Sequence, residues 1–212
     1  MVIAIDGPAG AGKSTVARGL ADELGITYLD SGAMYRCVAL AVERAGADPD
    51  DPGAAAGVAG DIEITFDGER VLLDSEDVSE SIRTPEISAL ASRVSVHPGV
   101  REAMVMRQRD LISNAAYVAE GRDIGTVVSP DAPLKVFLVA DDSERARRRA
   151  AETGRSVEEV LSDISDRDRR DTEREHGALQ AADDSVEVDT TALTPNEVVE
   201  RIAEIARSRG LA

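Results

Sequence analysis

The sequence lacks most of the residues that form aromatic cores and cross-links: it has no tryptophan, two phenylalanines and one cysteine, Cys37. A single cysteine excludes an internal disulfide and any zinc site built from several cysteines. The apolar residues are instead mainly alanine, valine, isoleucine and leucine. Such an aliphatic composition is typical of a parallel sheet covered by helices, and 212 residues fit one domain with insertions.

Long apolar stretches are also missing, since no run approaches the roughly 18 residues that indicate a membrane-spanning helix. The chain enters an apolar segment at Val2 without the charged leader of a signal peptide. We therefore expect a cytoplasmic protein that does not associate with a membrane.

Basic residues are few relative to acidic ones, which gives a formal net charge of −17. Because binding to a nucleic-acid backbone requires a basic surface, this charge argues against a nucleic-acid partner. Nine of the 22 arginines nevertheless lie between Arg145 and Arg174. This cluster indicates either a local anion site or a solvated helix face with ion pairs between successive turns, and composition does not separate the two.

The start of the chain contains the first specific pattern. Residues 1–6 are a short apolar run typical of a buried strand, residues 7–14 match G-x-x-x-x-G-K-[ST], and residues 16–24 have apolar positions at helical spacing. Glycines let backbone N–H groups converge on a triphosphate, while Lys13 reaches its phosphates and the Ser14 hydroxyl binds Mg²⁺. We predict a nucleoside-triphosphate site formed by Gly7, Pro8, Ala9, Gly10, Ala11, Gly12, Lys13, Ser14 and Thr15.

Short apolar segments alternate with helical patterns along the rest of the chain. Further strands are expected at residues 26–29, 116–119, 134–139 and 185–188. The alternation predicts an α/β fold with a doubly wound, five-stranded parallel sheet flanked by helices. Residues 61–74 differ, because two alternating segments surround the turn signal Asp67-Gly68, and we expect a small antiparallel hairpin there.

Polar clusters follow the ends of several predicted strands, where ligands of doubly wound sheets bind. Besides the phosphate-loop pattern, these are Asp30-Ser31 and residues 120–123, and we expect them to build one site. Glu120 at a strand tip is a candidate to hold Mg²⁺ through water. No N-K-x-D motif for guanine recognition occurs, which argues against a GTPase switch.

Four blocks of the sequence resemble bacterial cytidylate kinases. They are GPAGAGKS at residues 7–14, LDSGAMYR at 29–36, EGRDIGTVV at 120–128, and Arg167-Asp168-x-x-Asp171-x-x-Arg174, all in the order of that family. The resemblance covers essentially the whole chain. It implies a P-loop fold and an enzyme that transfers the γ-phosphoryl group of ATP, with Mg²⁺, to CMP or dCMP. ATP and CMP or dCMP would be its only partners, and we expect a monomer.

The resemblance also implies roles for individual residues. Acceptor binding is expected from Ser31, Arg36, Ser92, Arg101, Arg122, Asp123, Arg167, Asp171 and Arg174. Of these, three would surround cytosine: Ser92, Arg101 and Asp123. The groups expected to act on the transferred phosphoryl group are Lys13, Arg36, Arg122, Arg167 and Arg174. The Mg²⁺ ligand would be Ser14, with Glu120 acting through water in place of the aspartate of the family.

The division of the chain follows from the same resemblance. Residues 1–212 would form one kinase domain with a nucleoside-monophosphate-binding insertion at 33–83, which contains the hairpin, and a helical lid at 143–174. The core would comprise residues 1–32, 84–142 and 175–212. Two alternatives remain, a kinase of another nucleoside monophosphate and a nucleotide-binding switch without transferase activity.

Overall fold

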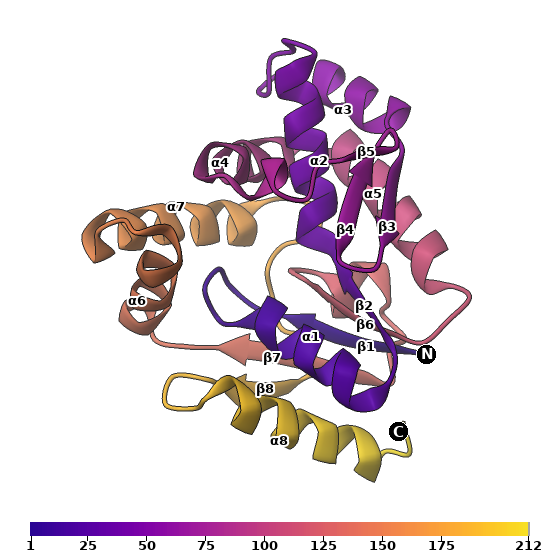
Figure 1. Cartoon of the computed structure of the whole chain (residues 1–212), viewed down its shortest axis with the longest axis vertical. Helices are drawn as coiled ribbons and strands as arrows, with labels where there is room; N and C mark the ends of the chain where they lie inside the picture. The colour runs from indigo at the N-terminus through magenta and orange to yellow at the C-terminus, as the bar shows by residue number, and fades with distance from the viewer. Residues whose placement is uncertain (212) are drawn as a thin grey trace. The chain divides into compact units, whose positions relative to one another are not determined.

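The computed structural model describes residues 1–211. These residues form two compact units. The first unit contains residues 1–30, 109–173 and 177–211, and the second contains residues 31–108 and 174–176. Figure 1 labels the helices and strands of both units.

The first unit is built on a parallel sheet of five strands, in the order β2-β6-β1-β7-β8. The strands are β1 (Val2–Asp6), β2 (Thr27–Asp30), β6 (Tyr117–Gly121), β7 (Leu134–Val139) and β8 (Val186–Asp189). Every residue of the central strand β1 is buried, as expected for a strand with both faces covered. The structure thus confirms the predicted five-stranded parallel sheet.

Helices α1 (Lys13–Leu24) and α8 (Pro195–Ser208) lie side by side against this sheet (Figure 1). Leu20 of α1 and Ile202 of α8 are fully buried in one apolar cluster with residues of β1, β7 and β8. The start of α8 is fixed by a reciprocal capping box between Thr194 and Glu197. These contacts bury the aliphatic core that the composition predicted.

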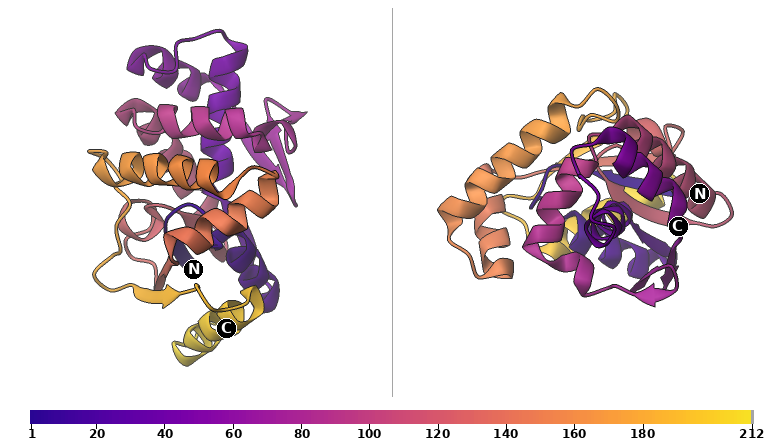
Figure 2. Two further views of the ribbon diagram at one scale, coloured as in Figure 1. Left: turned by 90° about the vertical axis from the view of Figure 1, so that its left-hand side faces the viewer. Right: turned by 90° about the horizontal axis from the view of Figure 1, so that it is seen from above.

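Two further helices of the first unit, α6 (Asp142–Thr153) and α7 (Val157–Glu173), pack against each other (Figure 2). They share a small apolar cluster of Ala146, Ala150, Val160 and Ile164, against which Ala9 also packs. A short π-helical turn, η2 (Ile124–Val128), follows β6.

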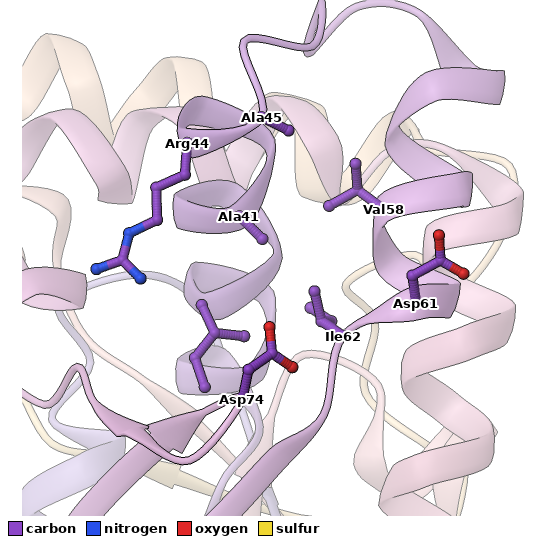
Figure 3. Close-up of a pocket in the computed structure, with 8 residues that line it drawn as sticks. Ala41, Arg44, Ala45, Val58, Asp61, Ile62 and Asp74 are labelled. Atoms are coloured by element: carbon purple, nitrogen blue, oxygen red, sulfur yellow. The ribbon is translucent and has the colours of Figure 1, made fainter.

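The second unit contains α2 (Ser31–Arg44), α3 (Pro52–Asp61), η1 (Ser81–Arg83), α4 (Pro85–Val94) and most of α5 (Pro98–Ile112). Its three-stranded antiparallel sheet consists of β3 (Ile64–Asp67), β4 (Arg70–Leu73) and β5 (Glu76–Asp77). The predicted hairpin is therefore present as β3 and β4, and the short strand β5 adds to it. A cavity of this unit lies among α2, α3 and β4, and its apolar lining consists of Ala41, Ala45, Val58, Ile62 and Leu73 (Figure 3).

The second unit extends to Gln108, beyond the boundary at residue 83 that the resemblance implies for the insertion. Packing of α4 against α2 explains why residues 85–94 belong to this unit, since it joins residues on both sides of that boundary into one compact body. The assignment of core, insertion and lid as functional segments stays a prediction. Within residues 1–211, no helix combines the length and hydropathy needed to cross a membrane.

Candidate active site

The phosphate loop, residues 7–12, connects β1 to α1 in the first unit. At Gly7 the backbone has a φ of 150°, and a Cβ atom there would lie 2.3 Å from the carbonyl oxygen of Leu138, so only glycine fits. Gly12 precedes α1 and has no side chain to cap the helix. The positive end of α1 therefore stays open to an anion, as a triphosphate site requires.

Lys13, the first residue of α1, is buried, and its Nζ donates a 2.7 Å hydrogen bond to the carbonyl oxygen of Pro8. Burial, and next the positive charge of Arg122, lower the pKa of Lys13 to about 7, whereas the charge of Glu120 raises it. A triphosphate bound in the loop would stabilise the protonated lysine further. The loop thus has a buried lysine beside it whose pKa is lowered by burial.

Glu120 is buried at the carboxyl end of β6 and accepts hydrogen bonds from the hydroxyls of Tyr28 and Ser14. Burial raises the pKa of Glu120 and the charge of Asp30 raises it further, whereas Lys13 and both hydroxyls lower it. Burial also raises the pKa of Tyr28, so its phenol stays protonated and remains a donor. These contacts hold the carboxylate of Glu120 beside the first turn of α1.

The turn after β6 is fixed by Asp6, the last residue of β1. Its carboxylate accepts hydrogen bonds from the backbone N–H groups of Ile124 and Gly125, at 2.9 and 2.7 Å. Burial raises the pKa of Asp6 to about 6, although the two hydrogen bonds lower it. Because these amides directly follow Arg122 and Asp123, Asp6 fixes the backbone that bears both residues.

Arg122 connects the phosphate loop to α7. Its Nη1 donates to the carbonyl oxygen of Gly7 at 2.9 Å, and its Nε donates to Oδ2 of Asp171 at 2.8 Å. Asp171 is also 3.9 Å from Nε of Arg167. The structure therefore brings together the predicted residues Arg122, Arg167 and Asp171 next to the loop, within the first unit.

Composition left two interpretations of the arginine-rich segment open, an anion site and a solvated helix face with ion pairs, and the arginines differ in which one they fit. Arg147, Arg149 and Arg169 pair with carboxylates three residues away along their helices, and their side chains are 71%, 38% and 64% exposed. Arg145 is instead buried, with a side-chain exposure of 6%. Exposed pairs of this kind contribute little to stability, so the anion-binding interpretation applies only to part of the segment.

The second unit contains the other predicted acceptor residues: Ser31, Arg36, Ser92, Arg101 and Arg174. Arg101 is buried, and its guanidinium lies over the ring of Tyr35, 5.5 Å from the centroid. Ser92 is 3% exposed, and its Oγ has no hydrogen-bond partner within residues 1–211. A buried hydroxyl without a partner is costly unless something else supplies the hydrogen bond, which fits a ligand-binding role.

A family model described as cytidylate kinase matches residues 3–208. The chain belongs to the cytidylate kinase family. Family membership confirms the predicted phosphotransferase activity on cytidylate, and it sets aside a nucleotide-binding switch without transferase activity.

Individual relatives are similar in sequence to this chain over nearly its whole length. A cytidylate kinase from Caldanaerobacter subterraneus is 51% identical over 97% of this chain and 94% of the relative. Cytidylate kinases from Geobacter sulfurreducens and Mycolicibacterium paratuberculosis are 45% and 47% identical over 99% of this chain, and the alignments cover 94% and 96% of those proteins. Sequence similarity at this level is continuous across both units.

Solved structures show the same fold at low identity. A shikimate kinase from Bacteroides thetaiotaomicron is 15% identical, with a TM-score of 0.52 and 98% of both chains covered. A shikimate kinase from Acinetobacter baumannii is 18% identical, with a TM-score of 0.50 and 100% and 95% coverage. These similarities confirm the predicted P-loop kinase fold.

The donor set at the loop fits a Mg²⁺ ion that arrives with a nucleotide. The Ser14 hydroxyl and the Glu120 carboxylate are joined by a hydrogen bond, so one ion and its water could contact both. Residues 1–211 contain no group of three or more histidine, cysteine or acidic side chains that could bind a metal by themselves. Phosphate oxygens and water would have to complete the coordination of the ion, as is usual for Mg²⁺.

Several residues of this site were not recognised in the sequence. They are Asp6, which holds the β6 turn, Tyr28, which holds Glu120, and the pair Arg145 and Asp168, which contacts the loop. For Tyr28 a signal existed, because it lies two residues before Asp30 and therefore on the same face of a strand that ends at the site. Asp168 stands in the fourth block that resembles the family, but its contact with the loop, like those of Asp6 and Arg145, depends on backbone groups of distant segments and has no local signature.

Proposed function

We propose that the enzyme binds MgATP in the phosphate loop and transfers the γ-phosphoryl group to the phosphate of CMP or dCMP. The observation that supports this most directly is the position of Arg122. Its guanidinium donates to the loop carbonyl of Gly7, and its charge is the second-largest influence on the pKa of Lys13. An arginine assigned to the acceptor is thus a direct neighbour of the loop that would hold the donor.

On the donor side, the proposed ATP site comprises residues 7–15 with Lys13 at the β- and γ-phosphates. Ser14 would bind Mg²⁺ directly, and Glu120 would bind it through water. When bound, the ion neutralises phosphate charge and orients the phosphates. Tyr28 keeps Glu120 in position by a hydrogen bond.

On the acceptor side, we assign Asp123, Arg101 and Ser92 to cytosine. A carboxylate accepts a hydrogen bond from the N4 amine of cytosine but cannot accept one from the O4 oxygen of uracil. Because a buried group left unpaired costs free energy, this arrangement rejects uracil. Arg36, Arg122 and Arg174 would bind the acceptor phosphate and Arg167 and Asp171 the ribose. Ser31 would also contact the acceptor.

The chemistry requires charge neutralisation rather than a general base, because the acceptor is already a phosphate anion at neutral pH. Two anions must be brought into line while negative charge spreads over the transferred group. Lys13 and the arginines at positions 36, 122, 167 and 174 would compensate this charge. Residues 143–174 would act as a lid that excludes water, which would otherwise hydrolyse ATP.

An ADP-release assay with CMP, dCMP, UMP, AMP and GMP as acceptors tests this proposal. The expected result is Mg²⁺-dependent turnover with CMP and dCMP and at least about 10²-fold lower kcat/KM with UMP. A preference for another monophosphate would overturn the cytosine assignment, and hydrolysis of ATP unaffected by any acceptor would overturn the transferase mechanism. We further propose that the enzyme is a cytoplasmic monomer that acts on free nucleotides.

A further inference from the structure

Helix α7 contacts the phosphate loop through Asp168, a residue to which the proposed mechanism gives no role. Oδ1 of Asp168 accepts a hydrogen bond from the backbone N–H of Ala9 at 3.2 Å. Oδ2 of Asp168 accepts one from Nη1 of Arg145 at 2.5 Å, and the same nitrogen donates to the carbonyl oxygen of Ala9 at 2.8 Å. Both polar backbone groups of Ala9 are therefore held by this pair of side chains.

The pair is part of a tightly packed contact between α6 and the loop. Arg145 is 5% exposed, and its Nη2 donates to Asp142 at 2.6 Å. A Cβ atom at Gly10, whose φ is 76°, would lie 2.9 Å from the carbonyl oxygen of Arg145, so the helix backbone lies directly against the loop. A shift of α6 or α7 would therefore have to be accompanied by a change in the loop.

A second connection lies one helical turn further along α7. Asp171 accepts a hydrogen bond from Arg122, which in turn donates to the carbonyl oxygen of Gly7. Asp168 and Asp171 are three residues apart and so lie on one face of the helix. Through these two carboxylates, the helix face that bears the proposed ribose-binding residues also holds the loop at Gly7 and Ala9.

We propose that Asp168 is a positioning residue that couples nucleotide binding in the phosphate loop to acceptor binding on α7. This inference rests on the proposed assignment of Arg122, Arg167 and Asp171 to the acceptor. A triphosphate that orders the loop also orders α7 through the Ala9 contacts, and an acceptor that orders α7 orders the loop in return. Each substrate therefore raises the affinity for the other by the same factor.

The test is the dissociation constant of CMP, measured by calorimetry with and without a saturating Mg²⁺ complex of the β,γ-imido analogue of ATP. For the unmodified enzyme we expect the analogue to tighten CMP binding by roughly 10-fold, within the usual range of coupling between sites. Asp168→Asn keeps the size of the side chain but removes its charge and one acceptor. This variant should reduce the effect to less than about 2-fold while it binds CMP alone nearly as well.

Asp166→Asn is the matched control, since Asp166 lies on the same helix, is 57% exposed and pairs with Arg169 on the helix surface. In this control variant, the ATP analogue should tighten CMP binding as much as it does in the unmodified enzyme. A second variant, Arg145→Lys, keeps the charge but replaces a planar guanidinium, whose two terminal nitrogens contact Ala9, Asp168 and Asp142, by one ammonium group on a shorter side chain, and it should also weaken the coupling. Thermal melting establishes that each variant is folded before titration.

Unchanged coupling in folded Asp168→Asn or Arg145→Lys would overturn the inference, as would an equal loss in Asp166→Asn. An unmodified enzyme that binds CMP equally well with and without the analogue would also overturn it, and would leave the proposed function intact. Failure of the unmodified enzyme to bind CMP at all would instead remove the proposed function, and this inference with it.

Discussion

Burial of Asp6 makes the stability of the enzyme depend on pH in a direction opposite to that of most carboxylates. Its pKa is raised from 3.8 to about 6 by burial. As the pH is lowered, Asp6 therefore takes up a proton at a higher pH in the folded state than in the unfolded state. The contribution of Asp6 to stability is therefore greatest at low pH and is lost as the pH rises through about 6. Relative to the protonated carboxyl, the ionised carboxylate lowers the free energy of unfolding by about 3 kcal/mol, since one pKa unit corresponds to about 1.4 kcal/mol.

The variant Asp6→Asn removes this titration and provides the comparison. An amide offers one acceptor where the carboxylate offers two, so either Ile124 or Gly125 loses its hydrogen bond, at a cost of about 1–3 kcal/mol. This cost is independent of pH. Between pH 7 and pH 5, the original enzyme should gain about 1.4 kcal/mol of unfolding free energy relative to the variant.

Urea unfolding of both proteins at pH 7, 6 and 5 measures this difference, and groups common to both proteins cancel. A near-constant difference over this range would show that Asp6 titrates like an exposed aspartate. If the unfolding free energy of the original enzyme instead fell relative to that of Asp6→Asn as the pH was lowered, the argument would be wrong in sign.

Other substitutions test the two sides of the site. Arg122→Ala and Arg174→Ala should each lower kcat/KM for CMP by about 10²-fold or more, since each removes one preorganised positive charge, and steady-state kinetics decides this. Gly10→Ala places a Cβ atom 2.9 Å from α6 and should weaken binding of an ATP analogue by at least about 10-fold, whereas Gly60→Ala, which has open space, should not. Tyr28→Phe removes a donor from a buried carboxylate and should lower the free energy of unfolding by about 1–3 kcal/mol, measured in urea.

The core of the fold could be predicted because its sequence patterns are local. β1 is a continuous apolar run, the glycines of the loop follow it, and the alternation of strands and helices determines a parallel sheet. The hairpin was predictable from Asp67-Gly68, but β5 was not, because it has only two residues and forms next to a turn in which Asp74 and Ser75 have positive φ.

Residues of the candidate site could be predicted where they lie in the four sequence blocks that resemble the family. The pairing of Arg122 with Asp171 joins two of these blocks, and the structure supplies the partner that the sequence did not. The contact of Asp168 with Ala9 could not be foreseen, because the acceptor is a side chain and the donor is a backbone amide 159 residues away. Any residue except proline could occupy the donor position as far as that hydrogen bond is concerned.

The central claim is that this enzyme phosphorylates a cytosine monophosphate at the expense of ATP. Its most direct test is a competition in which equal concentrations of CMP and UMP are incubated with the enzyme, ATP and Mg²⁺, and the diphosphates are separated by chromatography. The account predicts that CDP forms first and exceeds UDP by on the order of 10²-fold at early times, with one ADP released per diphosphate. Equal formation of CDP and UDP, or release of ADP without either, would contradict it.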